Sequence, residues 1–201
     1  HGAPEAPEYM AERGMVVDRL TRSKFGTGPG IAALKKRFSI GKELINMYVH
    51  PYIYMAHQLI REKGLDLGDV ERAIAEEMMK FDGIALAVSS SDLKNGRLPA
   101  APFIEQIRRN FHPKRSGDID VLQEPYWFLY TDESIPLCTI HGSPWRYDTY
   151  VPIIFAGYGI KPQTVSRRVH TVDVALTLAT AIGTKPPSGV AGEVLLEVLG
   201  Q

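Results

Sequence analysis

The chain has 201 residues, of which 44% are hydrophobic and 23% charged, and this composition is typical of a globular protein rather than a disordered or fibrous one. Lysine and arginine together number 23, as do aspartate and glutamate, so no net charge draws the chain to nucleic acid or to an anionic membrane. No run of about 18 apolar residues occurs, which excludes a transmembrane helix.

The start of the chain and its one cysteine bear on cellular context. The sequence opens at His1 without an initiator Met, and we expect an N-terminal portion of the protein, with any signal peptide, to precede it. Cys138 alone cannot form an internal disulfide, and it fits a reducing or an oxidising compartment. We expect Cys138 to be a small buried hydrophobic residue.

The first 39 residues predict two short helices joined by a loop. Residues 4–13 have a proline in the first turn and Gly14 beyond the end, and residues 31–38 form the second helical stretch. The intervening residues 25–30 hold three glycines and a proline, which is typical of a loop.

Residues 40–130 predict alternating strands and helices. An amphipathic helix is expected at 67–80, because apolar side chains recur there at three- and four-residue spacing after a candidate N-cap, Asp66. A further helix is expected at 102–111. The expected strands are 44–49, 52–55, 84–88, 119–122 and 126–130. Since the connections are short, this region predicts a compact α+β layer that forms a cap or insertion subdomain.

The remaining residues predict a strand and a helix packed in α/β fashion. Residues 151–157 form a nearly continuous apolar run, as in strands that are buried on both faces of a central sheet. Thr171 is a candidate N-cap for a helix over 172–182, with Gly183 as its stop.

Two histidines precede glycines, in His1-Gly2 and in His141-Gly142-Ser143. A histidine at a strand end followed by glycine suits a metal ligand, because the small neighbour lets the backbone and a bound ion approach. For an isolated His-Gly pair, a structural or surface role is the stronger expectation, so the pairs by themselves do not establish a metal site.

The longer run that begins at His141 is more specific. It reads His-Gly-Ser-Pro-Trp-Arg-Tyr-Asp-Thr-Tyr-Val-Pro-Ile-Ile-Phe-Ala-Gly-Tyr-Gly-Ile. This run resembles the C-terminal signature of the alkaline phosphatase superfamily, especially the type I phosphodiesterase/nucleotide pyrophosphatase-like alkaline phosphatases with a threonine nucleophile. Residues 168–183 are similar to the superfamily's Asp-Ile-Ala-Pro-Thr-Leu helix, with Leu176 where proline is usual, and parts of 52–119 also resemble this subfamily.

The resemblance implies an α/β fold with three parts. Residues 1–39 would be a fragment of the core domain, and residues 40–130 an inserted α+β cap subdomain. Residues 131–201 would be a C-terminal segment of the alkaline phosphatase-like core sheet with its helices, carrying the His-Gly-Ser motif.

The resemblance also implies a site with two Zn²⁺ ions. His1-Gly2 looks like the end of the family's Asp-His-Gly motif, whose ligands hold the metal at the nucleophile, and His141 matches the ligand to the metal that holds the attacking water. The Asp of that motif, the nucleophile and the other ligands have no counterpart in this chain. Because one imidazole per ion binds zinc weakly, we expect little or no zinc binding and no catalysis by this chain alone.

Other polar residues have structural interpretations. Asp148 could orient His141, although capping of a turn is the stronger expectation. His170 and Asp173 stand at a helix start, which favours capping over metal binding, and a turn before a strand explains Asp118 and Asp120. The residues left as structural or surface positions are His50, His57, His112 and the basic group Arg108, Arg109, Lys114 and Arg115.

The resulting hypothesis is the C-terminal fragment of a zinc-dependent phosphoric ester hydrolase. The resemblance implies a periplasmic or extracellular parent that acts on a small phosphate ester, and the absent N-terminal portion of the same protein is the expected partner. Apolar strand edges left uncovered could also form a homodimer. Sulfatase or phosphonate hydrolase chemistry and a non-catalytic binding or scaffold module remain as alternatives.

Overall fold

The computed structural model describes residues 2–21, 29–40, 42–129, 139–157 and 159–200. The chain divides into two compact units, His1–Tyr150 and Val151–Gln201. His1 and Cys138, about which the sequence made predictions, lie outside the described residues. None of the helices in the described ranges is both long enough and apolar enough to cross a lipid bilayer.

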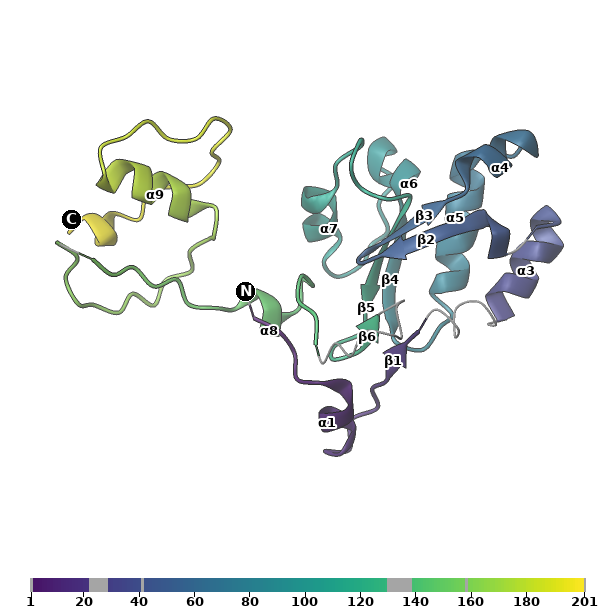
Figure 1. Cartoon of the computed structure of the whole chain (residues 1–201), viewed down its shortest axis with the longest axis horizontal. Helices are drawn as coiled ribbons and strands as arrows, with labels where there is room; N and C mark the ends of the chain where they lie inside the picture. Colours follow the sequence, from purple (N-terminus) through teal and green to yellow (C-terminus); the bar gives the residue numbers. More distant parts are fainter. Residues whose placement is uncertain (1, 22–28, 41, 130–138, 158, 201) are drawn as a thin grey trace. The chain divides into compact units, whose positions relative to one another are not determined.

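A four-stranded antiparallel sheet forms the centre of the first unit (Figure 1). Its strand order is β2-β3-β5-β4, so β2 and β3 form a hairpin and β5 lies between β3 and β4. The strands are β2 (Ile45–Val49), β3 (Tyr52–Met55), β4 (Ile84–Ser89) and β5 (Ile119–Gln123). All four lie where the sequence predicted them, and together with the helices they confirm a mixed α/β fold.

Helix α5 (Leu67–Met78) covers one face of this sheet, and α3 (Pro29–Phe38) packs against α5. The predicted N-cap is confirmed, because the Asp66 side chain accepts a hydrogen bond from the Asp69 backbone N–H at 2.9 Å. The buried residues of α5 include Val70, Ala73, Ile74 and Met78. They join strand side chains in the larger apolar core, as the helical period predicted, whereas Glu71, which the same period places on the exposed side, is buried as well.

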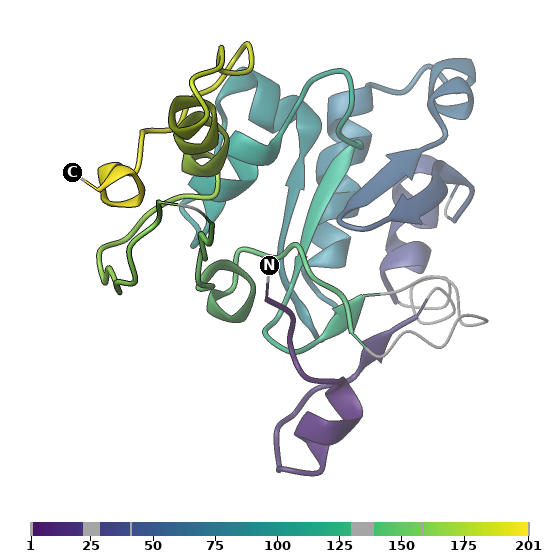
Figure 2. The ribbon, with the colours of Figure 1, turned by 60° about the vertical axis from the view of Figure 1, so that its left-hand side comes forward.

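The opposite face of the sheet is covered by α7 (Ile104–Asn110) and by the side chain of Trp145. The buried residues of this smaller core are Leu86, Val88, Leu93, Ile107 and Leu122. Because both faces are covered, every residue of β5 is buried, including the carboxyl group of Asp120 at 5% exposure. Figure 2 shows the two helical layers on either side of the sheet.

Helix α4 (His57–Glu62) follows β3, and α6 (Ser90–Asn95), which was not predicted, follows β4. Helix α6 begins where Ser89 accepts a hydrogen bond from the Asp92 N–H at 3.1 Å. The serine run that leads into α6 has low helix propensity, which is why periodicity alone does not reveal it.

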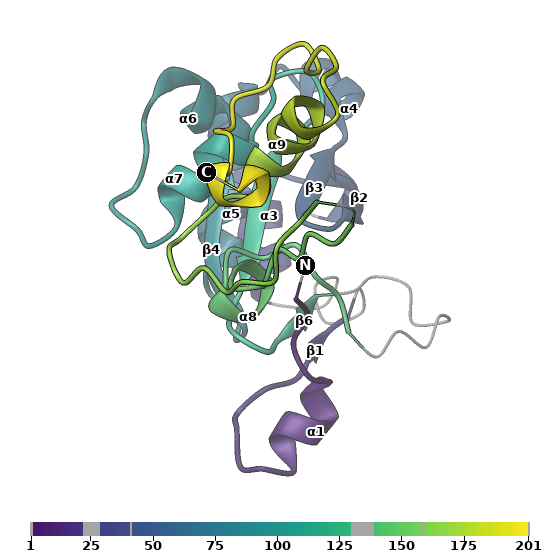
Figure 3. The same cartoon turned by 90° about the vertical axis from the view of Figure 1, so that its left-hand side faces the viewer.

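A second, two-stranded sheet pairs the start of the chain with the residues after β5. Strands β1 (Arg19–Leu20) and β6 (Phe128–Leu129) run parallel, close to α1 (Pro7–Ala11) (Figure 3). Arg19 pairs with the carboxylate of Glu8 on α1, and this pairing lowers the pKa of Glu8 to about 2. Strands β1 and β6, which are far apart in the sequence, are thereby paired with each other in the two-stranded sheet.

The second unit contains α9 (Asp173–Ala181) and a short 3₁₀ helix, η2 (Leu196–Leu199). The prediction of a buried strand at 151–157 is wrong, since no strand forms there and Ile154 is 83% exposed. A strand requires hydrogen bonds to a neighbour, and within the described residues no segment pairs with this run.

Thr171 is not the N-cap of α9, which corrects a second expectation. Instead, Asp173 is buried at the first turn and accepts hydrogen bonds from the backbone N–H groups of His170 at 2.7 Å and Glu193 at 2.9 Å. Both N–H groups lie outside α9, which has no side-chain cap, so the expectation that the His170/Asp173 pair caps the helix is not confirmed. The same carboxylate also ties the start of the helix to the chain that leads into η2.

Candidate functional site

The segment that carries His141 is fixed to the sheet by Trp145. The Trp145 Nε1–H donates to the carbonyl oxygen of Gln123, at the end of β5, at 2.8 Å. The indole ring also meets Phe103 edge to face, with 4.8 Å between ring centroids. An aromatic side chain four residues after His141 thus anchors a segment that, over its described residues 139–145, contains no helix or strand.

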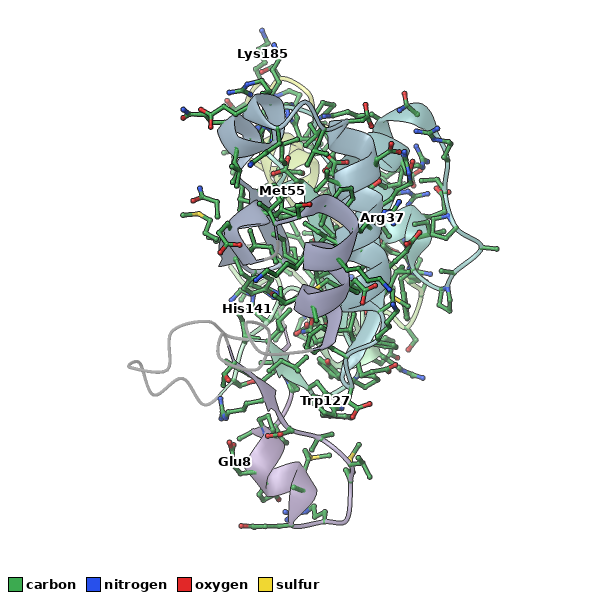
Figure 4. The ribbon with its side chains drawn as sticks, turned by 90° about the vertical axis from the view of Figure 1, so that its right-hand side faces the viewer. Glu8, Arg37, Met55, Trp127, His141 and Lys185 are labelled. Atoms are coloured by element: carbon green, nitrogen blue, oxygen red, sulfur yellow. The ribbon has the colours of Figure 1, made fainter. Side chains whose placement is uncertain are left out.

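Asp148 closes the turn after His141. It lies on the short helix α8 (Arg146–Thr149) and is 7% exposed. Its Oδ2 accepts two hydrogen bonds from Ser143, from the backbone N–H at 2.7 Å and from Oγ at 2.5 Å. Gly142 has φ +106°, a conformation that L side chains rarely adopt, so glycine is needed between His141 and this turn. His141 itself is solvent-exposed (Figure 4).

The start of the chain lies against the same helix. The Gly2 N–H donates to the carbonyl oxygen of Asp148 at 3.3 Å, and Figures 1 and 2 show the purple start of the chain beside α8. A Cβ at Gly2 would lie 1.7 Å from the carbonyl oxygen of Tyr147, so only glycine fits. The glycines of both His-Gly pairs are therefore needed in the same small region.

His50 lies beside this turn, although no partner for it was expected from the sequence. Its Nδ1 lies 3.0 Å from the hydroxyl of Tyr48, while its Nε2 is buried and makes no hydrogen bond. A Cβ placed on Gly142 would come within 4.0 Å of this Nε2. Burial lowers the pKa of His50, and the charges of Asp148 and His141 act on it in opposite directions, raising and lowering it respectively.

The second oxygen of Asp148, Oδ1, is also buried without a hydrogen bond. His50 Nε2 and Asp148 Oδ1 are thus two buried polar atoms that have no hydrogen-bond partner. Buried polar atoms are nearly always paired, and an orphan of this kind often marks a place for a bound water or ion. The described residues nevertheless contain no group of three His, Cys, Asp or Glu side chains already arranged to hold a metal ion.

The other carboxylates that the sequence singled out have structural partners. Asp118 accepts a hydrogen bond from the Met55 N–H at 2.7 Å and lies 2.8 Å from Nε2 of His57, joining the end of β3 to the start of α4. Asp120 belongs to the interior of the sheet, where burial raises its pKa to about 7. His112 is exposed, and its Nδ1 accepts a hydrogen bond from the Lys114 N–H at 3.2 Å.

Comparisons with known proteins give relatives that are longer than this chain. No protein-family profile matches it. The whole chain matches 36% of a protein named calcium-transporting ATPase from Myroides odoratus at 26% identity. At 27% identity, 85% of the chain matches 30% of alkaline phosphatase PafA from Elizabethkingia meningoseptica. At 26% identity, 70% of it matches 24% of alkaline phosphatase PhoV from Synechococcus elongatus.

The solved structure of wild-type alkaline phosphatase PafA has the same fold as this chain. The TM-score is 0.82 at 24% identity, and the match covers 100% of this chain and 37% of that one. The chain is thus similar in sequence to proteins named alkaline phosphatase and shares the fold of PafA. It spans about a third of the length of the first curated relatives that it matches, which have 36%, 30% and 24% of their length covered.

Proposed function

We propose that this chain is the part of a zinc-dependent phosphoric ester hydrolase that supplies His141 to the metal site. The observation that carries the proposal is the turn at His141, in which Gly142 and Asp148 fix the backbone and Gly2 docks on the same helix. The relatives named alkaline phosphatase support the reaction class. The proposed substrate is a small phosphate ester, and the proposed location of the parent protein is periplasmic or extracellular.

His141 is the side chain that this proposal assigns to a divalent cation, because an imidazole nitrogen is a donor of the kind that zinc binds. A pair of zinc ions, when bound, would polarise the phosphoryl oxygens and lower the pKa of the attacking hydroxyl or water. In this proposal His141 holds the metal that carries the water, and His1 belongs to the second metal site.

The chain alone is proposed to be inactive. A two-metal phosphoryl transfer depends on several ligands around each ion and on a nucleophile placed in line with the leaving group. The described residues offer no three-ligand group, and the family's threonine or serine nucleophile has no counterpart that we identify in the sequence. The chain's own residues therefore position His141 and shape the backbone around it.

Hydrolysis of an aryl phosphate by a longer form of this protein, which extends the chain to the length of its relatives, tests the function. We expect activity that a chelator abolishes and zinc restores, and a loss of more than about 100-fold in His141→Ala. The matched control is His112→Ala, which removes an exposed histidine and should leave the rate unchanged. Activity that is indifferent to zinc, or to His141→Ala, contradicts the proposal.

The choice among phosphomonoester, phosphodiester, sulfate and phosphonate substrates is tested in the same assay. We propose phosphomonoester or phosphodiester hydrolysis first. A faster rate on an aryl sulfate would identify a sulfatase instead. The absence of a ready three-ligand group favours one further candidate, a non-catalytic binding or scaffold module that keeps the fold without the site. A longer protein that folds, binds no zinc and hydrolyses none of these esters would support that candidate.

A further inference from the structure

Glu71 is a buried carboxyl group on α5, on the side of the helix that its period would leave exposed. It has 0% exposure, and α6 packs against α5 beside it (Figure 1). We propose that Glu71 is a pH-dependent clamp, which holds α6 against α5 while its carboxyl group is protonated and releases α6 when that group ionises. The inference is independent of the proposed function, because Glu71 belongs to neither metal site of that proposal.

One oxygen of Glu71 holds the first turn of α6. Its Oε2 accepts a hydrogen bond from the Ser91 backbone N–H at 2.8 Å. The next donor along the chain, the Asp92 N–H, bonds to Ser89 Oγ at 3.1 Å. Because the first N–H groups of a helix have no partner within the helix, α6 depends on these two side chains. One of the two comes from another helix, so α6 is tied to α5 through Glu71.

The same end of α6 is joined to the turn that precedes β5. The Ser90 backbone N–H donates to the carbonyl oxygen of Asp118 at 2.8 Å, and Ser90 Oγ donates to the carbonyl oxygen of Gly117. The first turn of α6 is therefore bonded to α5 on one side and to this turn on the other. Opening of α6 is the motion that would let water reach the Glu71 carboxyl group.

The second oxygen of Glu71, Oε1, is buried and has no hydrogen-bond partner among the residues that the structure describes. A protonated carboxyl group leaves a neutral polar group unpaired at this place. An ionised one leaves a buried charge, which is far more costly. The contacts of Glu71 therefore favour its protonated form in the closed arrangement of α5 and α6.

The charged side chains of α6 do not supply a counter-ion that offsets this cost. Asp92 is paired with Arg72 and Arg97. Lys94 is exposed, and its positive charge lowers the pKa of Glu71 by less than any other influence on that carboxyl group. A negative charge at Glu71 would thus be only weakly compensated from α6.

The turn before β5 adds a negative charge. The carboxylate of Asp118, which lies 2.8 Å from His57 Nε2, raises the pKa of Glu71. Burial is the largest influence and also raises this pKa, and the hydrogen bond from Ser91 offsets only part of it. In the folded chain the pKa of Glu71 therefore lies above its ordinary value of 4.5.

The sign of the pH dependence follows from this difference. The closed form binds the Glu71 proton more tightly than an open form in which the carboxyl group meets water. The contribution of Glu71 to closure is fully present below pH 4.5 and is lost as the pH rises through the raised pKa. Each pH unit between the two pKa values should lower the protection of the α6 amides against hydrogen exchange about tenfold, and the loss should then level off.

The test combines two measurements on the 201-residue chain. The ¹³Cδ chemical shift of Glu71 against pH gives the midpoint of its ionisation, and Glu76, exposed on the same helix, is the reference. Hydrogen exchange of the α6 amides, divided by their intrinsic rates, gives their protection at each pH. We expect a midpoint above that of Glu76 and a loss of protection of about tenfold for each pH unit of the difference.

Two variants isolate Glu71 from other groups that titrate. Glu71→Gln keeps an acceptor oxygen for Ser91 but cannot ionise, so the loss of α6 protection should be smaller than in the unaltered chain by the factor that the midpoint gives. The ionisation of Asp120 affects both proteins alike and cancels in this comparison. Glu76→Gln is the matched control and should keep the full pH dependence.

The inference is overturned if the midpoint of Glu71 is no higher than that of Glu76, which a buried water bonded to Oε1 would produce by stabilising the carboxylate. It is also overturned if α6 protection changes with pH equally in Glu71→Gln and in the unaltered chain. Should Glu71→Gln fail to fold, the unaltered chain decides alone. Its α6 amides must then lose protection relative to those of β5 by the factor that the midpoint gives, and an equal loss in both elements counts against the clamp.

Discussion

Asp120 is a carboxyl group on an interior strand of the sheet, with β3 on one side and β4 on the other. It is 5% exposed, and burial raises its pKa from 3.8 to about 7. The folded chain therefore binds a proton at this position more tightly than the unfolded chain does. Its contribution to stability is fully present below the unfolded pKa and is lost as the pH rises toward 7.

Replacing Asp120 with Asn should remove this pH dependence. We expect Asp120→Asn to gain stability relative to the unaltered chain by on the order of 3 kcal/mol between pH 5 and pH 8, because the buried charge no longer forms. Urea unfolding at both pH values measures the difference. Asp82→Asn, at an exposed position, is the control and should show no such trend. A difference that is the same at both pH values contradicts the interpretation.

Asp148 has two oxygens with different surroundings, and two substitutions separate them. Asp148→Asn keeps one acceptor oxygen for Ser143, so we expect a change in the free energy of unfolding of about 1 kcal/mol or less. Asp148→Ala removes both hydrogen bonds to Ser143 and should cost about 2 kcal/mol. Chemical denaturation measures both values. Equal losses in the free energy of unfolding in the two variants would show that the turn does not depend on an acceptor oxygen at position 148.

At the scale of elements, sequence patterns predicted helices and strands correctly where local chemistry determines the structure. Helix α5 was predicted from its 3.6-residue period and strands β2 to β5 from their apolar, strand-forming composition, and both are local properties. The apolar run at 151–157 failed because a strand depends on a partner elsewhere. His50 was missed for a related reason, since its approach to Gly142 is set by the packing of distant segments rather than by any spacing.

The start of α9 offers a test of which residue stabilises the first turn of the helix. Asp173 accepts hydrogen bonds from two backbone N–H groups and is buried, whereas Thr171 is exposed. Asp173→Ala should lower the local stability of α9 by about 1–2 kcal/mol, and Thr171→Ala should change it little. Hydrogen exchange of the α9 amides measures both effects. A larger loss in Thr171→Ala would restore the cap that the sequence predicted.

At the scale of the whole chain, the second unit exposes much apolar surface and has a small core. Among the residues described in this unit, the buried hydrophobic ones are Ala179 and Leu195. Its exposed ones include Ile154, Val172, Leu178, Ile182 and Leu196. The chain matches only 24–36% of the length of its first relatives. This is consistent with a longer protein in which other segments pack against this apolar surface. The division into a core fragment at 1–39, a cap at 40–130 and a core segment at 131–201 stays a prediction.

The exposed apolar surface predicts self-association of the isolated chain. We expect dimers or larger species whose proportion rises with concentration, because burying apolar side chains between copies is favourable. Sizing by light scattering over a tenfold range of concentration is the measurement. Replacing Ile154 and Ile182 with Ser should shift the chain toward monomer. A stable monomer at every concentration would show that the second unit needs no partner.

The account depends most on His141 being a metal ligand, and the most direct measurement is a crystal structure of the longer protein with data collected at the zinc absorption edge. The account predicts an anomalous peak at about 2.0–2.1 Å from a ring nitrogen of His141. It further predicts that the peak is lost in His141→Ala and retained in His112→Ala. A well-ordered His141 side chain with no metal within bonding distance, in crystals that contain zinc, would contradict it.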